Sequence, residues 1–369
     1  MQFIRASKES VLKPLQIVAG IVERRHTLPI LANVLLRKDG ESVSFLASDV
    51  EIQIQTTSSL GPGNDSGAIT LSAKKLLDIL RALPDGIDVT LAVANKKATL
   101  TAGKSRFAMQ TLGAEEFPTV TVASEFNASF ALPQKQLKHL FHMVHFAMAQ
   151  QDIRYYLNGL LLVTDGALVR VIATDGHRLA YCQAEVAGAA LAKHEVIVPR
   201  KTVLELQRLL ADSDDPVAID VAQNQIRFSF NDVQMVSKLV EGKFPDYQRV
   251  IPTGYSKMAL VNRESLAQSL GRVSIMTSDK FKGVRLAVAP AVLKIQTTNA
   301  DQEEAVEELD IDYAAEALEL GFNVTYLQDL LANLKGESIQ IAFGDASSSA
   351  LMTIPGDESF KYVVMPMRI

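Results

Sequence analysis

The sequence predicts an α+β protein made of three repeated domains, in each of which two helices pack on antiparallel sheets. Three observations lead to this prediction. An amphipathic helix pattern occurs three times, a second helix pattern recurs at a similar spacing, and alternating apolar and polar runs fill the segments between them. The chain has 369 residues, 48% of them hydrophobic, which is enough for two or three domains with buried cores.

The first helix of each repeat is marked by an apolar stripe with the spacing i, i+4 and i+7, which places three side chains on one helix face. The stripe recurs after 126 residues and again after a further 129 residues. A single stripe is ordinary core packing, whereas three at near-constant offset indicate triplication. The stripes are Val11, Leu15 and Val18; Leu137, Phe141 and Val144; and Leu266, Leu270 and Val273.

A second helix pattern repeats as well. The segments "SAKKLLDILRALP" and "PRKTVLELQRLL" match at an offset of 127 residues, which pairs Lys74 with Lys201 and Arg81 with Arg208. The segment "NVTYLQDLLANLK" is a weaker third copy. Together the two patterns predict helices at 7–25, 73–83, 133–150, 200–210, 262–280 and 323–335.

The segments between the helices alternate apolar and polar residues and contain turn residues, as in "VSFLASDVEIQIQT" and "ATLTAGKSRFAMQTL". This pattern is typical of antiparallel strands and hairpins. Breaks near "VASEFNAS" and "IPTGYSK" predict domains at residues 1–125, 126–253 and 254–369.

The composition indicates the cellular compartment in which the protein functions. The one cysteine, Cys182, rules out an intrachain disulfide framework and fits a reducing compartment. The N-terminal "MQFIRASKES" lacks the apolar segment of a secretory signal, and no apolar run approaches the roughly 18 residues of a membrane span. We therefore expect a cytoplasmic protein without a membrane segment.

Charge is distributed unevenly along the chain. The predicted helices have a net formal charge of +9, and because the whole chain has −5, the strands and loops have −14. Polar helix faces often contain Lys and Arg, so this bias by itself can be ordinary. If all the helices share one surface, however, that surface would face an anionic partner, and DNA held through its phosphates fits such a basic wall.

The stretch "IATDGHRLAYC" places Asp175, Gly176, His177 and Arg178 in consecutive positions and resembles an active site. A DNA-processing hydrolase using Asp175 and His177 is one interpretation, but no further acids or ligands gather nearby in the sequence. The equivalent segments of the other repeats, "LASDVEIQI" and "TTNADQEEA", lack the glycine and the histidine. Because Asp-Gly is a tight-turn dipeptide between strands, a plain hairpin is the competing interpretation.

Two further motifs do not support enzymatic chemistry. The "AGKS" at 102–105 resembles the end of a phosphate-binding loop, but the required first glycine is replaced by Ala98 and the stretch is predicted to form a hairpin. Three histidines, His139, His142 and His145, stand three residues apart on one helix without a carboxylate or cysteine in that helix, so we expect a solvated or DNA-facing role and no metal site.

Many separate motifs give the chain a specific resemblance to a known family. The triplicated helix and sheet unit, "RHTLPILANVLL", "QDIRYYLNGLLL", "ATDGHRLA", "VIVPRK", "KFPDYQRV", "KFKGVRL", "GFNVTY" and "YVVMPMRI" resemble the bacterial sliding clamps, the beta subunits of the replicative DNA polymerase III, from Met1 to Ile369. The resemblance implies a non-enzymatic DNA clamp without cofactors, in which two subunits join head to tail into a ring around double-stranded DNA and improve polymerase processivity.

The resemblance also implies that the "TDGHRLA" segment lines a pocket for short linear peptides. These would come from the replicative polymerase catalytic subunit, the clamp-loader ATPase, and other polymerases or repair proteins. Leu179 would supply apolar area and Arg178 hydrogen-bond donors. The implied pocket residues are Arg154, Leu157, Thr174, Gly176, His177, Arg178, Leu179, Pro245, Arg249, Val250, Asn323, Tyr326, Ser349, Val363, Val364, Met365, Pro366, Met367 and Arg368.

Two more surfaces follow from the same resemblance. The expected DNA-facing residues are Arg24, Arg25, Lys74, Lys138, Gln151, Tyr155, Tyr156, Lys201 and Arg208. The expected homodimer interface residues are Lys104, Arg106, Phe107, Met109, Ile275, Met276, Glu303, Glu304, Glu307 and Glu308. Acidic side chains of the third domain would there face basic side chains of the first domain of the other subunit.

Overall fold

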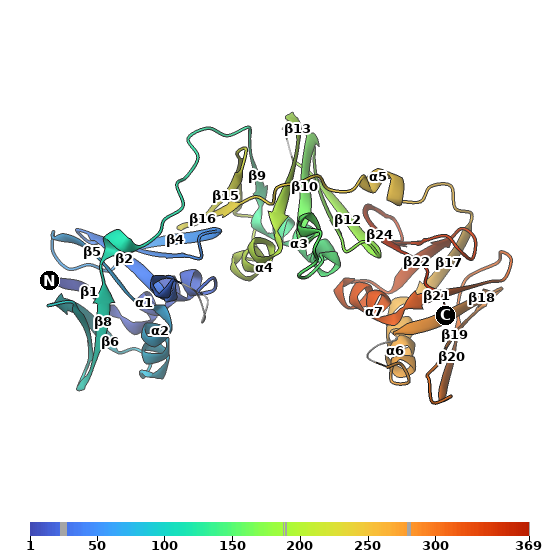
Figure 1. The fold of residues 1–369 in the computed structure, drawn as a ribbon, viewed down its shortest axis with the longest axis horizontal. Helices are drawn as coiled ribbons and strands as arrows, with labels where there is room; N and C mark the ends of the chain where they lie inside the picture. The colour runs from blue at the N-terminus through green and yellow to red at the C-terminus, as the bar shows by residue number, and fades with distance from the viewer. Residues whose placement is uncertain (23–27, 187, 189, 279–281, 369) are drawn as a thin grey trace. The chain divides into compact units, whose positions relative to one another are not determined.

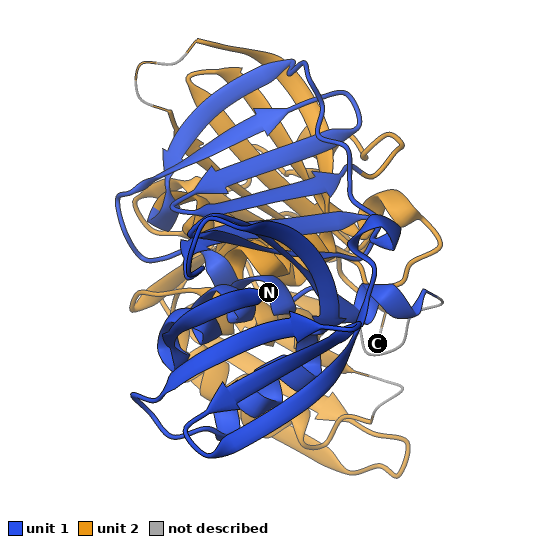
Figure 2. Ribbon diagram, turned by 90° about the vertical axis from the view of Figure 1, so that its left-hand side faces the viewer, with its two compact units in different colours: residues 1–135, 208–239 blue, residues 136–207, 240–369 orange. Residues whose placement is uncertain are grey.

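A computed structural model describes residues 1–22, 28–186, 188, 190–278 and 282–368. The chain divides into two compact units, residues 1–135 with 208–239 (unit 1) and residues 136–207 with 240–369 (unit 2) (Figure 2). Along the sequence, one order of elements occurs three times: strand, helix, four strands, helix, three strands. The triplication predicted from the apolar stripes is therefore visible in the element order.

Unit 1 is built around one antiparallel sheet in the strand order β1-β6-β7-β8-β5-β2-β3-β4-β16-β15-β14-β9 (Figure 1). Helices α1 and α2 pack against each other beside this sheet. The element bounds are β1 Gln2–Ser7, α1 Lys8–Ala19, β2 Asn33–Asp39, β3 Ser42–Ser48, β4 Ile52–Ser59, β5 Ser66–Ser72, α2 Ala73–Ala82, β6 Asp88–Ala94, β7 Lys97–Ala102, β8 Ser105–Leu112, β9 Ala128–Pro133, β14 Pro216–Val221, β15 Gln225–Phe230 and β16 Val233–Lys238.

Unit 2 contains two antiparallel sheets, in the orders β13-β10-β11-β12-β24-β23-β22-β17 and β20-β19-β18-β21. Helices α6 and α7 pack against each other (Figure 1). The bounds are α3 Gln134–Val144, β10 Gly159–Gly166, β11 Leu168–Thr174, β12 Arg178–Glu185, β13 Leu191–Pro199, α4 Arg200–Leu209, α5 Tyr247–Val250, β17 Lys257–Asn262, α6 Arg263–Ser274, β18 Gly283–Ala289, β19 Val292–Thr298, β20 Glu304–Asp310, β21 Leu318–Asn323, α7 Val324–Asn333, β22 Ser338–Phe343, β23 Ala350–Ile354 and β24 Asp357–Val364.

The three apolar stripes form the buried faces of α1, α3 and α6, as their spacing predicts. Each of the nine side chains in them is at most 3% exposed. Polar residues begin several of the helices: the side chains of Ser7, Ser72 and Asn262 each accept a hydrogen bond from a backbone N–H of the first turn. Such caps pair donors that a helix leaves unpaired at its start.

Three helices are shorter than the sequence pattern predicts. Helix α1 ends at Ala19, and residues 23–27 lie outside the described part of the chain. Helix α3 ends at Val144 and continues as the short 3-10 helix η3, His145–Ala147. Helix α6 ends at Ser274, one residue after its apolar stripe, because the hydroxyls of Ser274 and Thr277 bond back to helix carbonyls. The "AGKS" segment forms the turn between β7 and β8, as expected.

Candidate functional site

The turn between β11 and β12 is held by its own side chains. Gly176 has φ +91°, a backbone conformation that favours glycine. The Asp175 carboxylate accepts hydrogen bonds from the backbone N–H groups of His177 at 2.9 Å and Arg178 at 3.1 Å. A Cβ at position 176 would lie 2.8 Å from the Arg154 guanidinium. The turn therefore favours glycine, and a side chain at this position would also require the flexible Arg154 guanidinium to move.

An apolar cavity of about 200 Å³ lies beside this turn. Its walls come from distant parts of the sequence within unit 2: the 3-10 helix η4 (Tyr155–Leu157), the β11–β12 turn, α5 with the residues before it, and the end of β24. Many residues named from the sequence meet here. The lining residues are Arg154, Tyr156, Leu157, Thr174, Gly176, Arg178, Leu179, Pro245, Val250, Val363 and Met365.

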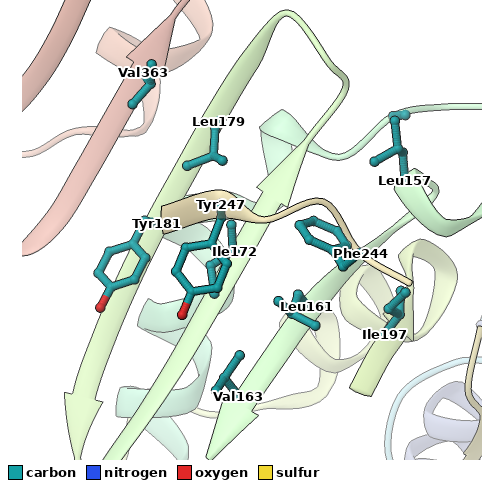
Figure 3. Close-up of a cluster of buried hydrophobic side chains, with 11 residues drawn as sticks. Leu157, Leu161, Val163, Ile172, Leu179, Tyr181, Ile197, Phe244, Tyr247 and Val363 are labelled. Carbon is teal, nitrogen blue, oxygen red and sulfur yellow. The ribbon is translucent and has the colours of Figure 1, made fainter. Parts of the chain in front are cut away.

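The cavity is backed by a cluster of buried side chains (Figure 3). Leu157, Leu179 and Val363 line the cavity and also belong to this cluster. Behind them, the rings of Tyr181 and Tyr247 lie 6.0 Å apart. Because these side chains are packed on the sheet, the cavity wall is preformed, which favours binding of an apolar side chain from outside.

The C-terminal tail is attached to the cavity by backbone hydrogen bonds. The N–H of Met365 donates to the His177 carbonyl at 2.9 Å, and the N–H of Met367 donates to the Gly321 carbonyl at 2.8 Å. Met365 is 42% exposed and lines the cavity, whereas Val364 is fully buried and does not line it. The tail is thus fixed while its methionines remain partly accessible.

A polar cavity of about 670 Å³ shares Arg154 and Arg178 with the apolar cavity. The Arg154 guanidinium pairs with Asp152 at 2.8 Å, and its hydrogen bonds lower the pKa of the Asp152 carboxyl to about 2. His177 lies here, stacked on Tyr326 with ring centroids 6.4 Å apart. Both His177 and Tyr326 were expected in the peptide pocket, and the structure places them on its polar side.

Other residues named for the pocket have separate local roles. The Asn323 side chain accepts from the N–H of Thr325 and begins α7. The Ser349 carbonyl accepts from the Tyr255 hydroxyl. Arg249 is exposed and pairs with Asp246 at 3.0 Å. Pro366 is partly buried and Arg368 is exposed in the tail.

The arrangement does not provide an acid or a nucleophile. The Asp175 carboxylate is used by the turn and by Arg178, whose Nε donates to it at 3.0 Å. Burial raises the pKa of the Cys182 thiol to about 12, so the reactive thiolate is suppressed. Among the described residues, no three His, Cys, Asp or Glu side chains are grouped as metal ligands.

The three histidines differ in exposure: His139 is exposed, whereas His142 and His145 are half-buried. His142 lies 3.1 Å from the Asn333 carbonyl of α7, and His145 lies 3.0 Å from the His142 carbonyl. Burial is the main cause that lowers the pKa of both His139 and His145. His142 is half-buried, and the expectation of a solvated or DNA-facing role stays a prediction.

Several residues expected to face DNA are accessible. Lys74 and Gln151 are exposed, Tyr155 is 57% exposed, and Lys138 and Lys201 are half-buried. Arg24 and Arg25 lie outside the described residues.

Two of the residues expected to face DNA make contacts within the protein. The Arg208 guanidinium donates to the Gln16 and Ile17 carbonyls at 3.2 and 2.7 Å, because it lies beside the last turn of α1. Tyr156 lines the apolar cavity, and its ring lies edge-on to that of Tyr155 with the ring centroids 5.9 Å apart. No local pattern in the sequence distinguishes these two side chains from their neighbours.

The expected interface residues lie on or beside β8 and β20 and just after α6. On β8, Arg106 is exposed, Phe107 is half-buried, and Met109 is only 6% exposed, so Met109 belongs to the core of unit 1. Lys104 is exposed in the turn before this strand. Ile275 is 75% exposed after α6, and Met276 beside it is half-buried.

The glutamates of the acidic strand β20 lie on both faces of the strand, because side chains alternate in direction along a strand. Glu304 and Glu308 are exposed on one face, and Glu303 is exposed just before the strand. Glu307 points to the other face and forms a two-point ion pair with Arg272 of α6 at 2.7 Å. This ion pair ties the Glu307 side chain to α6 of its own chain, whereas Glu304 and Glu308 are exposed, because the period of a strand is two residues.

Comparison with known proteins covers the whole chain. Family models of the DNA polymerase III beta subunit match with their N-terminal domain at residues 1–121, their central domain at 131–246 and their C-terminal domain at 248–368. The beta sliding clamp of Pseudomonas aeruginosa is 43% identical, and that of Escherichia coli strain K12 is 41% identical, each over 98% of both chains.

Solved structures agree with this result. A crystal structure of the DNA polymerase sliding clamp from Pseudomonas aeruginosa with a ligand matches with a TM-score of 0.96 and 42% identity over all of both chains. The same clamp bound to griselimycin matches with a TM-score of 0.96 and 43% identity, again over all of both chains.

The repeated α+β domains and these matches define a three-domain DNA clamp. The chain belongs to the DNA polymerase III beta subunit family, the beta sliding clamps. Its function is that of a processivity clamp for the replicative polymerase, and its role there is non-catalytic. The alternative of a hydrolase using Asp175 and His177 is therefore wrong.

Proposed function

We propose that the apolar cavity beside the β11–β12 turn binds short linear peptides of the polymerase, the clamp loader and other DNA-processing proteins. The observation that supports this most is the cavity itself: about 200 Å³, preformed, and lined by Leu157, Leu179, Val250 and Val363. Such a volume suits one leucine or aromatic side chain. The partly exposed methionines of the tail are adaptable fillers, which suits a pocket that serves several partners.

The proposed binding surface extends from the cavity along the tail. His177, Tyr326 and Arg249 would contact the polar parts of the peptide, while Met365 and Met367 would cover its apolar side chains. The remaining residues of the proposed surface are Arg154, Thr174, Gly176, Arg178, Pro245, Asn323, Ser349, Val364, Pro366 and Arg368.

We also propose that two subunits join head to tail through two strand edges. In the described residues, the outer side of β20 has no neighbouring strand, and the first part of β8 pairs only with β7. The exposed Glu304 and Glu308 would face Lys104 and Arg106 of the second subunit. Phe107 would pack near Ile275, so that charge complementarity sets the register and apolar contact stabilises the dimer.

The closed dimer would surround double-stranded DNA. Twelve helices packed at about 8–10 Å spacing would leave a bore of roughly 20–30 Å, wide enough for a duplex and water. Phosphate attraction by Lys74, Lys138 and Lys201 is independent of sequence and permits sliding. The proposed domains are residues 1–125, 126–253 and 254–369, and the proposed location is the cytoplasm.

One experiment tests the clamp directly. The protein is loaded onto nicked circular DNA and its retention is followed through a high-salt wash. A ring that holds DNA topologically stays on the circle and leaves after the circle is cut. Equal loss from circular and linear DNA would contradict the proposal, because contact strength alone would then determine how long the protein stays.

The peptide pocket has its own test. A fluorescently labelled peptide with a glutamine followed by leucine and phenylalanine is titrated with the protein, and anisotropy gives the dissociation constant. A second titration uses the protein with Leu179→Asp, which places a charge in the cavity. Equal affinity for both proteins would mean that the peptide binds elsewhere.

A further inference from the structure

The Arg178 side chain is buried between the two cavities, and each of its three nitrogens already donates a hydrogen bond. Nε donates to Asp175 at 3.0 Å, Nη1 donates to Asp329 at 2.6 Å, and Nη2 donates to the Phe146 carbonyl at 2.7 Å. The side chain is 9% exposed. These partners belong to the β11–β12 turn, to α7 and to the segment after α3.

Aromatic rings complete the surroundings of this guanidinium. Its central carbon lies 4.5 Å from the centre of the Tyr326 ring and 5.9 Å from that of Phe146. The Tyr362 hydroxyl of β24 donates to the Tyr326 carbonyl at 3.0 Å. Burial alone would lower the pKa of Arg178, whereas Tyr362 and the carboxylates of Asp329 and Asp175 raise it above its ordinary value.

These contacts limit what Arg178 can do for a bound peptide. Hydrogen bonds between a guanidinium and carboxylates are short and strong, and this group is shielded from water. A peptide that took one of these donors would leave a carboxylate or a carbonyl without its partner. Three of the five N–H groups of the guanidinium are used in these hydrogen bonds, so a direct donor role of Arg178 toward a peptide is confined to the remaining N–H groups of Nη1 and Nη2.

The same contacts connect the elements that form the pocket. The turn beside Thr174, Gly176 and Leu179 belongs to the second repeat, whereas the strand with Val363 and α7, whose Tyr326 and Asp329 line the polar cavity, belong to the third. β12 and β24 are hydrogen-bonded neighbours, and Arg178 is paired with Val364 across them. The Arg178–Asp329 ion pair adds a side-chain link from this turn to α7.

We propose that Arg178 is a positioning residue that acts with Asp329 to set the distance between the β11–β12 turn and α7, the two elements that carry His177 and Tyr326 on the polar side of the proposed pocket. This inference rests on the proposed peptide-binding function and assigns these residues an indirect role in it. The peptide would contact Leu179 and the tail together with His177 and Tyr326, and the ion pair would keep the turn and α7 at the spacing that one peptide can bridge. Asp329, 36% exposed, becomes a determinant of peptide affinity without contacting the peptide.

The test uses Asp329→Asn in the full chain with the labelled peptide described above. Asn keeps the shape of the side chain and removes its charge, while Asp175 remains to pair Arg178, so the fold should be retained. We expect peptide binding about tenfold weaker, which corresponds to about 1.4 kcal/mol. Asp165→Asn is the matched control, because Asp165 pairs with Arg170 at 3.3 Å elsewhere in unit 2. It should bind the peptide like the unchanged protein.

A double-mutant cycle separates positioning from a general loss of stability. Arg178→Lys keeps the charge but loses the planar guanidinium. If the two residues act through one ion pair, the double variant Arg178→Lys with Asp329→Asn should bind the peptide as well as the single variant of lower affinity. Asp329→Glu should restore most of the affinity. Additive losses, or unchanged affinity in Asp329→Asn, would overturn the inference. Failure of the unchanged protein to bind the peptide would instead refute the proposed pocket.

Discussion

Deletion of Met367–Ile369 should separate peptide binding from folding. Strand β24 ends at Val364, and the hydrogen bond from Met365 to the His177 carbonyl lies before the deletion. The deletion removes the hydrogen bond from Met367 to the Gly321 carbonyl. One backbone hydrogen bond contributes about 0.5–1.5 kcal/mol net, so the free energy of unfolding should change by about that amount or less.

The effect on peptide binding should be larger. Met367 would cover one apolar side chain of the peptide, and burying a side chain of this kind contributes about 1.5–3 kcal/mol. The dissociation constant should therefore rise roughly tenfold to a hundredfold. Anisotropy with the labelled peptide measures this change, and urea unfolding measures stability.

A chain shortened by Ile369 alone is the matched control, because it keeps Met367. Sedimentation should give the same oligomeric state for all three proteins, since the proposed dimer edges lie on β8 and β20. Full peptide affinity in the longer deletion would refute the reasoning and would remove the tail from the proposed pocket.

Four further outcomes are expected. Phe107→Ala should shift the protein towards monomer in sedimentation at low micromolar concentration, because about 1.5–3 kcal/mol of apolar burial is removed from each interface; an unchanged dimer population would contradict this. Replacing Lys74 and Lys201 together by Ala should reduce the salt dependence of DNA binding. The slope of log affinity against log salt concentration should be smaller by about 1 for each phosphate that is no longer neutralised. An unchanged slope would reject both residues as DNA contacts. Lys38→Met should cost about 1–3 kcal/mol in urea unfolding, since the buried Lys38 ammonium donates to the Pro62 carbonyl and pairs with Asp65; a change below that range would show that the loop after β4 is held by other contacts. Partial burial lowers the pKa of His145, so the unfolded chain takes up its proton first and stability should fall as the pH drops below about 6.5. His145→Gln should flatten this slope, and an equal slope in both proteins would assign the effect to other groups.

The interior of each repeat could be predicted from the sequence. The stripes with i, i+4 and i+7 spacing are buried in α1, α3 and α6 as expected, because helix periodicity depends only on local geometry and on the hydrophobic effect. The Asp-Gly turn was equally predictable, since Gly176 adopts a positive φ that its neighbours would resist. Family membership followed from motifs spread over the whole chain.

Side-chain direction at the surfaces was decided by the tertiary structure. Arg178 follows a turn and was expected to meet a peptide, but Asp329, 151 residues later in the chain, binds its guanidinium. Glu307 was grouped with its acidic neighbours, yet Arg272 of α6 holds it on the opposite face of β20. Met109 is in the core for the same reason of strand alternation.

A charged side chain is paired or free according to which distant element lies within reach, and no local pattern contains that distance. The sequence by itself determined the repeats, the apolar faces, the Asp175–Gly176 turn and the family. The tertiary structure decided which polar side chains are bound inside the protein and which remain available to DNA, peptide or a second subunit, because that choice depends on contacts between residues far apart in the chain.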